Sequence, residues 1–302
     1  MISHSARMLT GGSSRMATPT TRKKQLGYAL RYLREQAGLN QVDAGAHIRK
    51  PGNRMAEVEN GQRNLAHGDL ILLLQLYGVT DDERITTLTQ LREGTSQRKR
   101  WTGYRAVYPE QFRMFVDLEE DADLIRMVEA EVIPGLLQCE SYVRALYADR
   151  PMHEGAFTMG ALVESRLARQ KIFTKPDAPQ LMVVMSESSL RRWQGGPEVM
   201  REQVDHLVAM SKWSNVQLQV LPFRTPTDKG DCVGYRFTLL RVPSPGISGP
   251  LELVYIDQVI DTRYLEDKPA VAAHDTLWHQ LSAAALSPED SRAFIRDVAS
   301  DL

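Results

Sequence analysis

The stretch that decides the fold is QLGYALRYLREQAGLNQVDAGAHIRKPGNRMAEVENG, residues 25–61. Its spacing predicts three short helices joined by two tight connections. The first, 25–36, ends before Gly38 and carries apolar residues three and four apart. The second, 41–47, follows Asn40, a suitable N-cap. The third, 51–59, begins at a proline, whose missing N–H costs nothing in the first turn.

Two more helices complete a small domain. Residues 70–77 are nearly all apolar, which predicts a buried helix, and residues 81–92 begin with three acids and end with an arginine, as the helix dipole favours. We therefore expect an all-α five-helix domain over residues 22–94. A tail without periodicity, 1–21, precedes it and is expected to be disordered. A basic linker, 95–110, follows it.

The first three helices have the layout of a helix-turn-helix, in which one helix braces across the phosphate backbone and the next enters the major groove. Gln41, at the start of the second helix, is expected to reach a phosphate with its amide. The third helix is expected to read bases, because Arg pairs with guanine, Asn with adenine and Glu with cytosine. Asn53, Arg54 and Glu57 are expected to contact bases, and the bare backbone of Gly52 is expected to lie exposed beside them. Arg49, Lys50 and Arg63 are expected to contact phosphates.

The charge distribution is compatible with a polyanionic partner. The whole chain has a formal net charge of -1, yet its first 100 residues hold 16 Lys+Arg against 9 Asp+Glu. The remaining residues hold 21 against 29. A basic first third favours DNA binding without proving it. The alternative is a plain helical bundle with a basic surface.

This region resembles the repressor-type helix-turn-helix family, also called the xenobiotic-response-element family. The resemblance lies in three runs, Leu39-Asn40-Gln41, Ala44-Gly45 and MAEVENG at 55–61. The resemblance implies that Glu59 braces the fold through hydrogen bonds inside the domain. Two positions depart from the family pattern. Arg49 stands in the turn where a glycine is usual, and Gly52 stands where the third helix usually has a polar residue. The second departure shifts base reading to Asn53 and Arg54.

The rest of the chain, 111–302, predicts an α+β domain with a mixed or antiparallel sheet of about four strands. The continuous apolar run 181–186 is typical of a strand covered on both faces, and the alternating run 216–221 of a half-exposed strand. Two further strands are predicted at 235–242 and 251–256. Helices are predicted at 111–131, 136–148, 160–173, 197–212, 270–285 and 288–298.

The run EAEVIPGLLQCESYVRA at 129–145 resembles the C-terminal domain of a large group of actinobacterial regulators. Further matches lie at 166–170, 187–190, 196–203, 220–223, 254–255 and 285–291. These regulators join a repressor-type helix-turn-helix to an uncharacterised domain that is often called antitoxin-like. The resemblance implies a DNA-binding protein that works with a small partner protein encoded nearby. It also implies a second domain that senses a ligand or that partner.

Arg166, Arg169 and Gln170 share one helix face in the second domain. They are candidates to clamp a carboxylate or an acidic residue of a partner, and the alternative is a solvated face or salt bridges within the chain. Three aromatic side chains of the linker are Trp101, Tyr104 and Tyr108. They either line a pocket or pack the two domains together, with ordinary core packing as the alternative.

Nothing in the sequence points to catalysis. It has no phosphate loop, no G-x-G-x-x-G, no G-x-S-x-G and no C-x-x-C. His274 and His279 are five apart, the wrong spacing for a metal pair on one helix, and the acidic run 117–123 is expected to be a solvated helix face. We expect no catalytic residue, no metal and no cofactor.

The location expected for the protein is the cytoplasm. Two cysteines in 302 residues suggest a reducing compartment, no apolar run is long enough to span a bilayer, and the N-terminus is polar. The protein is expected to contact no membrane.

The leading hypothesis is a cytoplasmic transcription regulator that binds an inverted repeat in double-stranded DNA as a homodimer. The dimer is inferred because one short recognition helix reads only a few base pairs. The alternative is an antitoxin-like protein whose main role is to bind a small partner, with DNA binding only autoregulatory. An enzyme in the second domain is the third alternative.

Overall fold

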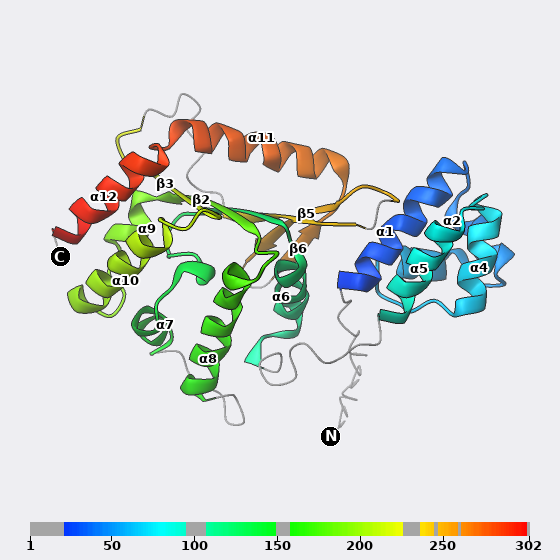
Figure 1. Ribbon diagram of the computed structural model, residues 1–302, viewed down its shortest axis with the longest axis horizontal. Coiled ribbons are helices and arrows are strands. Elements are labelled where there is room, and N and C mark those ends of the chain that lie inside the picture. The colour runs from blue at the N-terminus through cyan, green and yellow to red at the C-terminus, as the bar shows by residue number, and fades with distance from the viewer. Residues whose placement is uncertain are drawn as a thin grey trace, which may run out of the picture.

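The structure is a computed structural model that describes residues 21–94, 107–148, 158–225, 236–244, 247–258 and 261–300. The predicted disordered tail lies outside the described residues except for Thr21, and so do residues 95–106 of the predicted linker, with Trp101 and Tyr104. Figure 1 shows a helical N-terminal domain beside a larger α+β domain.

The N-terminal domain contains the five predicted helices. They are α1 (Thr21–Gln36), α2 (Gln41–His47), α3 (Gly52–Glu59), α4 (His67–Leu76) and α5 (Asp82–Gly94). The expected cap of α2 is confirmed, because the Asn40 side chain accepts a hydrogen bond from the Asp43 N–H at 2.8 Å. The expected apolar stripe of α1 is buried in the core of this domain, which includes Leu30, Met55 and Leu73.

Gly27 allows α1 and α3 to meet backbone against backbone. A Cβ at this position would lie 2.3 Å from the carbonyl oxygen of Glu59 and 2.6 Å from that of Val58. Both distances are far below van der Waals contact, so any larger residue would push the two helices apart. The position of α3 in the domain therefore depends on a bare backbone in α1.

The α+β domain is built on a six-stranded sheet, two strands more than the predicted four. In spatial order the strands are β3 (Val216–Leu221), β2 (Gln180–Ser186), β1 (Leu124–Glu129), β4 (Phe237–Val242), β5 (Leu251–Asp257) and β6 (Thr262–Leu265). The first three are parallel, and β4, β5 and β6 are antiparallel to their neighbours. The sheet is thus mixed, and its parallel half meets its antiparallel half between β1 and β4.

Helices cover both faces of the sheet. Figure 1 shows α11 along one face and α6, α7, α8 and α10 on the other. Ile125 and Met127 of β1 join the core on the α6 side, and Val128 joins the core under α11 with Trp278. The bounds are α6 (Glu110–Asp121), α7 (Glu140–Tyr147), α8 (Met159–Gln170), α9 (Glu187–Arg191), α10 (Pro197–Met210), α11 (Lys268–Ala284), α12 (Pro288–Ser300), and the 3₁₀ turns η2 (Gly135–Leu137) and η3 (Lys171–Thr174).

The helix predicted over 111–131 is wrong in its second half. Helix α6 ends at Asp121, and residues 124–129 form β1 instead. Carboxylates crowd the end of α6, where they oppose the negative end of the helix dipole. The acidic run is also not a solvated face. Glu119 is buried against Arg169, and Glu120 pairs with Lys175.

The two domains touch through α1. Lys24 forms an ion pair with Glu266, and the side-chain amide of Gln25 donates to the Pro243 carbonyl at 2.8 Å. Tyr28 packs against the core of the α+β domain, and Ile247 belongs to the core of the helical domain. No helix among the described residues is both long and apolar enough to cross a membrane.

Candidate nucleic-acid interface and pocket

The exposed surface of α3 carries the predicted base-reading residues. Asn53 is exposed, and the Arg54 side chain keeps 34% of its surface in solvent. Gly52 packs against α2, because a Cβ there would lie 3.0 Å from Val42 Cγ2. The close approach of the two helices therefore explains why a glycine replaces the polar residue expected at this position.

Glu57 is already bound to arginines of its own domain. Its carboxylate lies 2.7 Å from Arg63 Nε and 3.5 Å from Arg54 Nη1. Each partner is partly exposed, so water screens these contacts and they are weak. Reading a cytosine with Glu57 or a guanine with Arg54 would require both residues to leave this arrangement.

Arg49 and Lys50 lie in the turn between α2 and α3. Both are exposed, and within the described residues neither side chain has an ion pair. Arg49 has φ of 56°, the left-handed conformation that glycine adopts most easily. This geometry explains why the family usually has a glycine at the position. An arginine at this position strains the backbone, and it places a positive charge on the surface.

Gln41 makes a contact that the sequence did not predict. Its amide nitrogen donates to Glu59 Oε2 at 2.8 Å, inside the domain. Glu59 also accepts hydrogen bonds from Arg34, and its side chain is fully buried. The brace that the resemblance implies for Glu59 is confirmed. The predicted phosphate contact of Gln41 stays a prediction.

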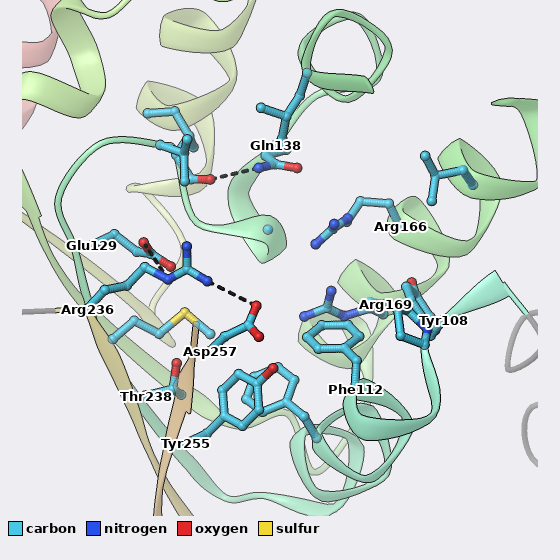
Figure 2. Close-up of a pocket in the computed structure, with 18 of the residues that line it drawn as sticks. Tyr108, Phe112, Glu129, Gln138, Arg166, Arg169, Arg236, Thr238, Tyr255 and Asp257 are labelled. Atoms are coloured by element: carbon cyan, nitrogen blue, oxygen red, sulfur yellow. Dashed lines mark hydrogen bonds and ion pairs between the residues drawn. The ribbon is translucent and has the colours of Figure 1, made fainter. Parts of the chain in front are cut away.

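A cavity of about 540 Å³ opens in the α+β domain. It lies at the carboxyl ends of β1 and β5 and is closed by α6, α7 and α8 (Figure 2). Ligands of sheets with parallel strands commonly bind at such carboxyl ends, where the strand order changes direction. Here the change falls between β1 and β4, beside the cavity.

The three predicted residues of α8 have separate roles. Arg169 is 2% exposed and grips Glu119 through two hydrogen bonds of 2.7 Å. Gln170 donates to the Gln138 carbonyl at 2.6 Å. The expected alternative of a salt bridge within the chain therefore holds for Arg169, whereas Gln170 makes a hydrogen bond to the backbone. Arg166 lines the cavity and donates to the Tyr147 hydroxyl at 2.6 Å.

A second charged group faces the cavity from the sheet. Arg236 lies 3.1 Å from Asp257 Oδ2 and 3.7 Å from Glu129 Oε2. Burial raises the pKa of Glu129 to about 7, although the positive charge of Arg236 opposes the rise. The three residues come from strand ends that lie far apart in sequence, and no local sequence pattern indicates them.

Aromatic side chains form the floor of the cavity (Figure 2). The rings of Phe115 and Tyr255 lie 4.2 Å apart between centroids, and Phe112 is 5.2 Å from Phe115. Tyr108 also lines the cavity, in agreement with one of the two roles expected for it. Six polar atoms of the cavity residues are buried without a hydrogen-bond partner among the described residues: Tyr108 Oη, Glu129 Oε2, Gln138 Oε1, Arg166 Nε, Arg169 Nη1 and Tyr255 Oη.

The described residues contain no cluster of three or more His, Cys, Asp or Glu side chains that would hold a metal ion. The charged groups of the cavity are instead arginines and carboxylates from separate elements. This chemistry suits an organic ligand that carries a charge and an apolar body.

Comparisons with known proteins agree with the two-domain architecture. Residues 25–85 match a family described as a helix-turn-helix domain, and residues 112–297 match the domain of unknown function DUF5753. No curated protein matches the chain, and no solved structure matches it. The pair of domains fits a helix-turn-helix regulator. The DUF5753 match covers more than half of the sequence, and the chain therefore belongs to the DUF5753 family.

Proposed function

We propose that the protein is a sequence-specific DNA-binding transcription regulator. Helix α3 enters the major groove, where Asn53 and Arg54 read bases, with Glu57 as a third candidate. Arg49, Lys50 and Arg63 bind phosphates around it, and the backbone of Gly52 and the amide of Gln41 approach the DNA. The observation that carries this proposal is the exposed basic turn before α3, where Arg49 and Lys50 have no ion-pair partner among the described residues.

The protein binds DNA as a homodimer on an inverted repeat. Helix α3 has eight residues, too few to select a site in a genome on its own. Two copies related by a two-fold axis place two such helices in successive major grooves, about 34 Å apart. The α+β domain supplies dimerisation in this proposal.

The α+β domain also senses a ligand or a small partner protein. Helix α6 supports a route for the signal, because it lines the cavity with Phe112 and Phe115 and also lies against the sheet region that touches α1. Tyr264 donates to the Gln111 carbonyl at 2.7 Å, and the nearby Glu266 pairs with Lys24 of α1. A ligand that shifts α6 would therefore act on the helix that holds α3.

A selection experiment tests the DNA-binding proposal without knowledge of the operator. The full chain is incubated with a library of random duplexes, and bound sequences are amplified and read. We expect enrichment of an inverted repeat whose half-site centres lie about one helical turn apart. The selected duplex should bind at least roughly a thousandfold more tightly than a scrambled one. Equal affinity for both duplexes would overturn the proposal.

The antitoxin-like alternative is separated by purification from the native host. A small protein that copurifies at one-to-one stoichiometry, together with selection of a single site next to the protein's own gene, would favour that alternative. Several selected sites in unrelated promoters, mapped by chromatin immunoprecipitation, would favour a regulator. No observation on the described residues specifically favours the enzyme alternative.

A further inference from the structure

Arg166 makes no ion pair with any described residue at the cavity. Arg169 is neutralised by Glu119, and Arg236 lies between Glu129 and Asp257. Among the described residues no carboxylate lies within ion-pair distance of Arg166, and its Nε atom is buried without a hydrogen bond. A partly buried, unpaired charge is costly, and an anionic ligand would remove that cost.

Gly135 leaves room for the guanidinium groups at this end of the cavity. A Cβ on Gly135 would lie 2.4 Å from Arg166 Nη1 and 3.6 Å from Arg169 Nη1. The two nitrogens therefore approach the same bare stretch of backbone, and Arg169 Nη1 has no hydrogen-bond partner in the structure. Figure 2 shows both guanidinium groups directed toward the cavity. A planar carboxylate would supply the acceptors that they lack.

The other walls of the cavity are largely apolar and aromatic, which suits an apolar, aromatic body of the ligand. Phe112, Phe115 and Tyr255 present aromatic rings to the cavity, and Met127, Ile133 and Leu146 extend its apolar lining. A volume of about 540 Å³ lies within the range of about 300–1,000 Å³ that is usual for small-molecule sites. An aromatic ring would stack against this floor, because rings favour offset and edge-to-face contacts.

The charge balance favours one negative charge on the ligand over two. The wall opposite Arg166 carries Glu129 and Asp257 against the single cation Arg236. That wall offers a phosphate dianion no free cation, so the dianion would find only Arg166 as an unpaired cation among the described residues of the cavity. A carboxylate carries one charge, which Arg166 alone balances.

We infer that the cavity binds a small aromatic monocarboxylate, with its carboxylate on Arg166 and its ring against Phe112 and Tyr255. This inference rests on the ligand-sensing role proposed for the α+β domain.

Calorimetric titration of the full chain, without DNA, tests the inference with three matched probes. They are 3-phenylpropionate, its neutral amide 3-phenylpropionamide, and phenyl phosphate. We expect the acid to bind and to raise the melting temperature, and we expect the amide and the phosphate to bind at least about tenfold more weakly. Absence of binding by the acid, or equal binding by the amide or the phosphate, would overturn the inference.

Variants locate the bound acid. Arg166→Gln removes the charge, and Gly135→Ala pushes the guanidinium away while keeping it, so each should weaken binding of 3-phenylpropionate by about tenfold or more. Arg144→Gln is the matched control, because Arg144 is an exposed arginine of α7 that pairs with Glu140. Circular dichroism verifies that each variant is folded. Equal affinities of a folded Arg166→Gln variant and the control would place the acid elsewhere and overturn the inference.

The same proteins separate this inference from the proposed function. The titration uses no DNA, and selection from the random library uses no ligand. Binding of the acid without any selected DNA site would support the cavity assignment and overturn the regulator proposal. A selected DNA site without binding of the acid would support the regulator proposal and overturn the cavity assignment.

Discussion

Arg34 in α1 and Glu59 in α3, 25 positions apart in sequence, form a buried ion pair that links the two helices. The Arg34 Nε and Nη2 atoms lie 2.6 and 3.0 Å from the two carboxylate oxygens of Glu59. A third bond from Gln41 of α2 ends on the same carboxylate. Glu59 thus ties all three helices of the helix-turn-helix together, and it fixes the angle at which α3 is presented.

Glu59→Gln should destabilise the helical domain by about 3–5 kcal/mol, because it leaves the buried Arg34 charge without its counter-ion. Hydrogen exchange of α1 and α3 amides in the full chain measures the loss. Glu35→Gln is the control, since Glu35 lies 3.6 Å from Arg34 with 60% of its side chain exposed. The control should change stability by less than about 0.5 kcal/mol. Similar losses in the two variants would show that the buried geometry contributes little.

Arg49→Gly should stabilise the domain by up to about 1 kcal/mol, because glycine adopts the left-handed conformation without steric cost. The same change removes a positive charge and should weaken binding to every DNA sequence. Urea unfolding and anisotropy titration measure the two effects. Lys50→Ala removes the neighbouring charge without the backbone gain, so it should weaken DNA binding and leave stability unchanged. A loss of stability in Arg49→Gly would contradict the strain argument.

The helical domain could be predicted because its signals are local. The cap at Asn40, the stop at Gly38 and the apolar stripe of α1 act within a few residues of their own helix. The role of Gly27 was missed, because it depends on the backbone of α3, more than thirty residues further along the chain. Helical spacing alone gives no information on where two helices approach so closely.

The α+β domain was predicted less completely for the same reason. Strand β1 follows α6 with only a short break, and both of its faces are covered, so it lacks the alternation of a half-exposed strand. Arg126 within β1 is paired with Asp275 of α11 and stacks on Trp278, a stabilisation that comes from distant sequence. The cavity could not be predicted from the sequence either. Its charged residues Glu129, Arg236 and Asp257 are distant in sequence and come together only in the folded sheet.

Arg54→Ala should cost about 1–3 kcal/mol of binding and relax the preference at one base position of the selected site. The reason is that Arg54 is the partly exposed arginine of α3 next to Asn53. Anisotropy titrations on the selected and scrambled duplexes give the two affinities. Equal losses on both duplexes would show that Arg54 meets only phosphate.

Lys50→Ala is the matched test of a phosphate contact. It should weaken binding to both duplexes alike and should reduce the slope of log affinity against log salt by about one unit. The measurement is a titration series over increasing salt. An unchanged slope would place Lys50 away from the DNA backbone.

Glu129→Gln should remove a pH dependence from the stability of the α+β domain. Burial raises the pKa of Glu129 to about 7 from 4.5. Between these values the folded protein keeps a proton that the unfolded chain has released, so the free energy of unfolding falls as pH rises and levels off above about 7. The variant cannot ionise. Relative to the wild type it should therefore gain roughly 2 kcal/mol between about pH 5 and about pH 8, which urea unfolding at both values measures. A constant difference between the two proteins would mean that Arg236 compensates the burial of Glu129 in full.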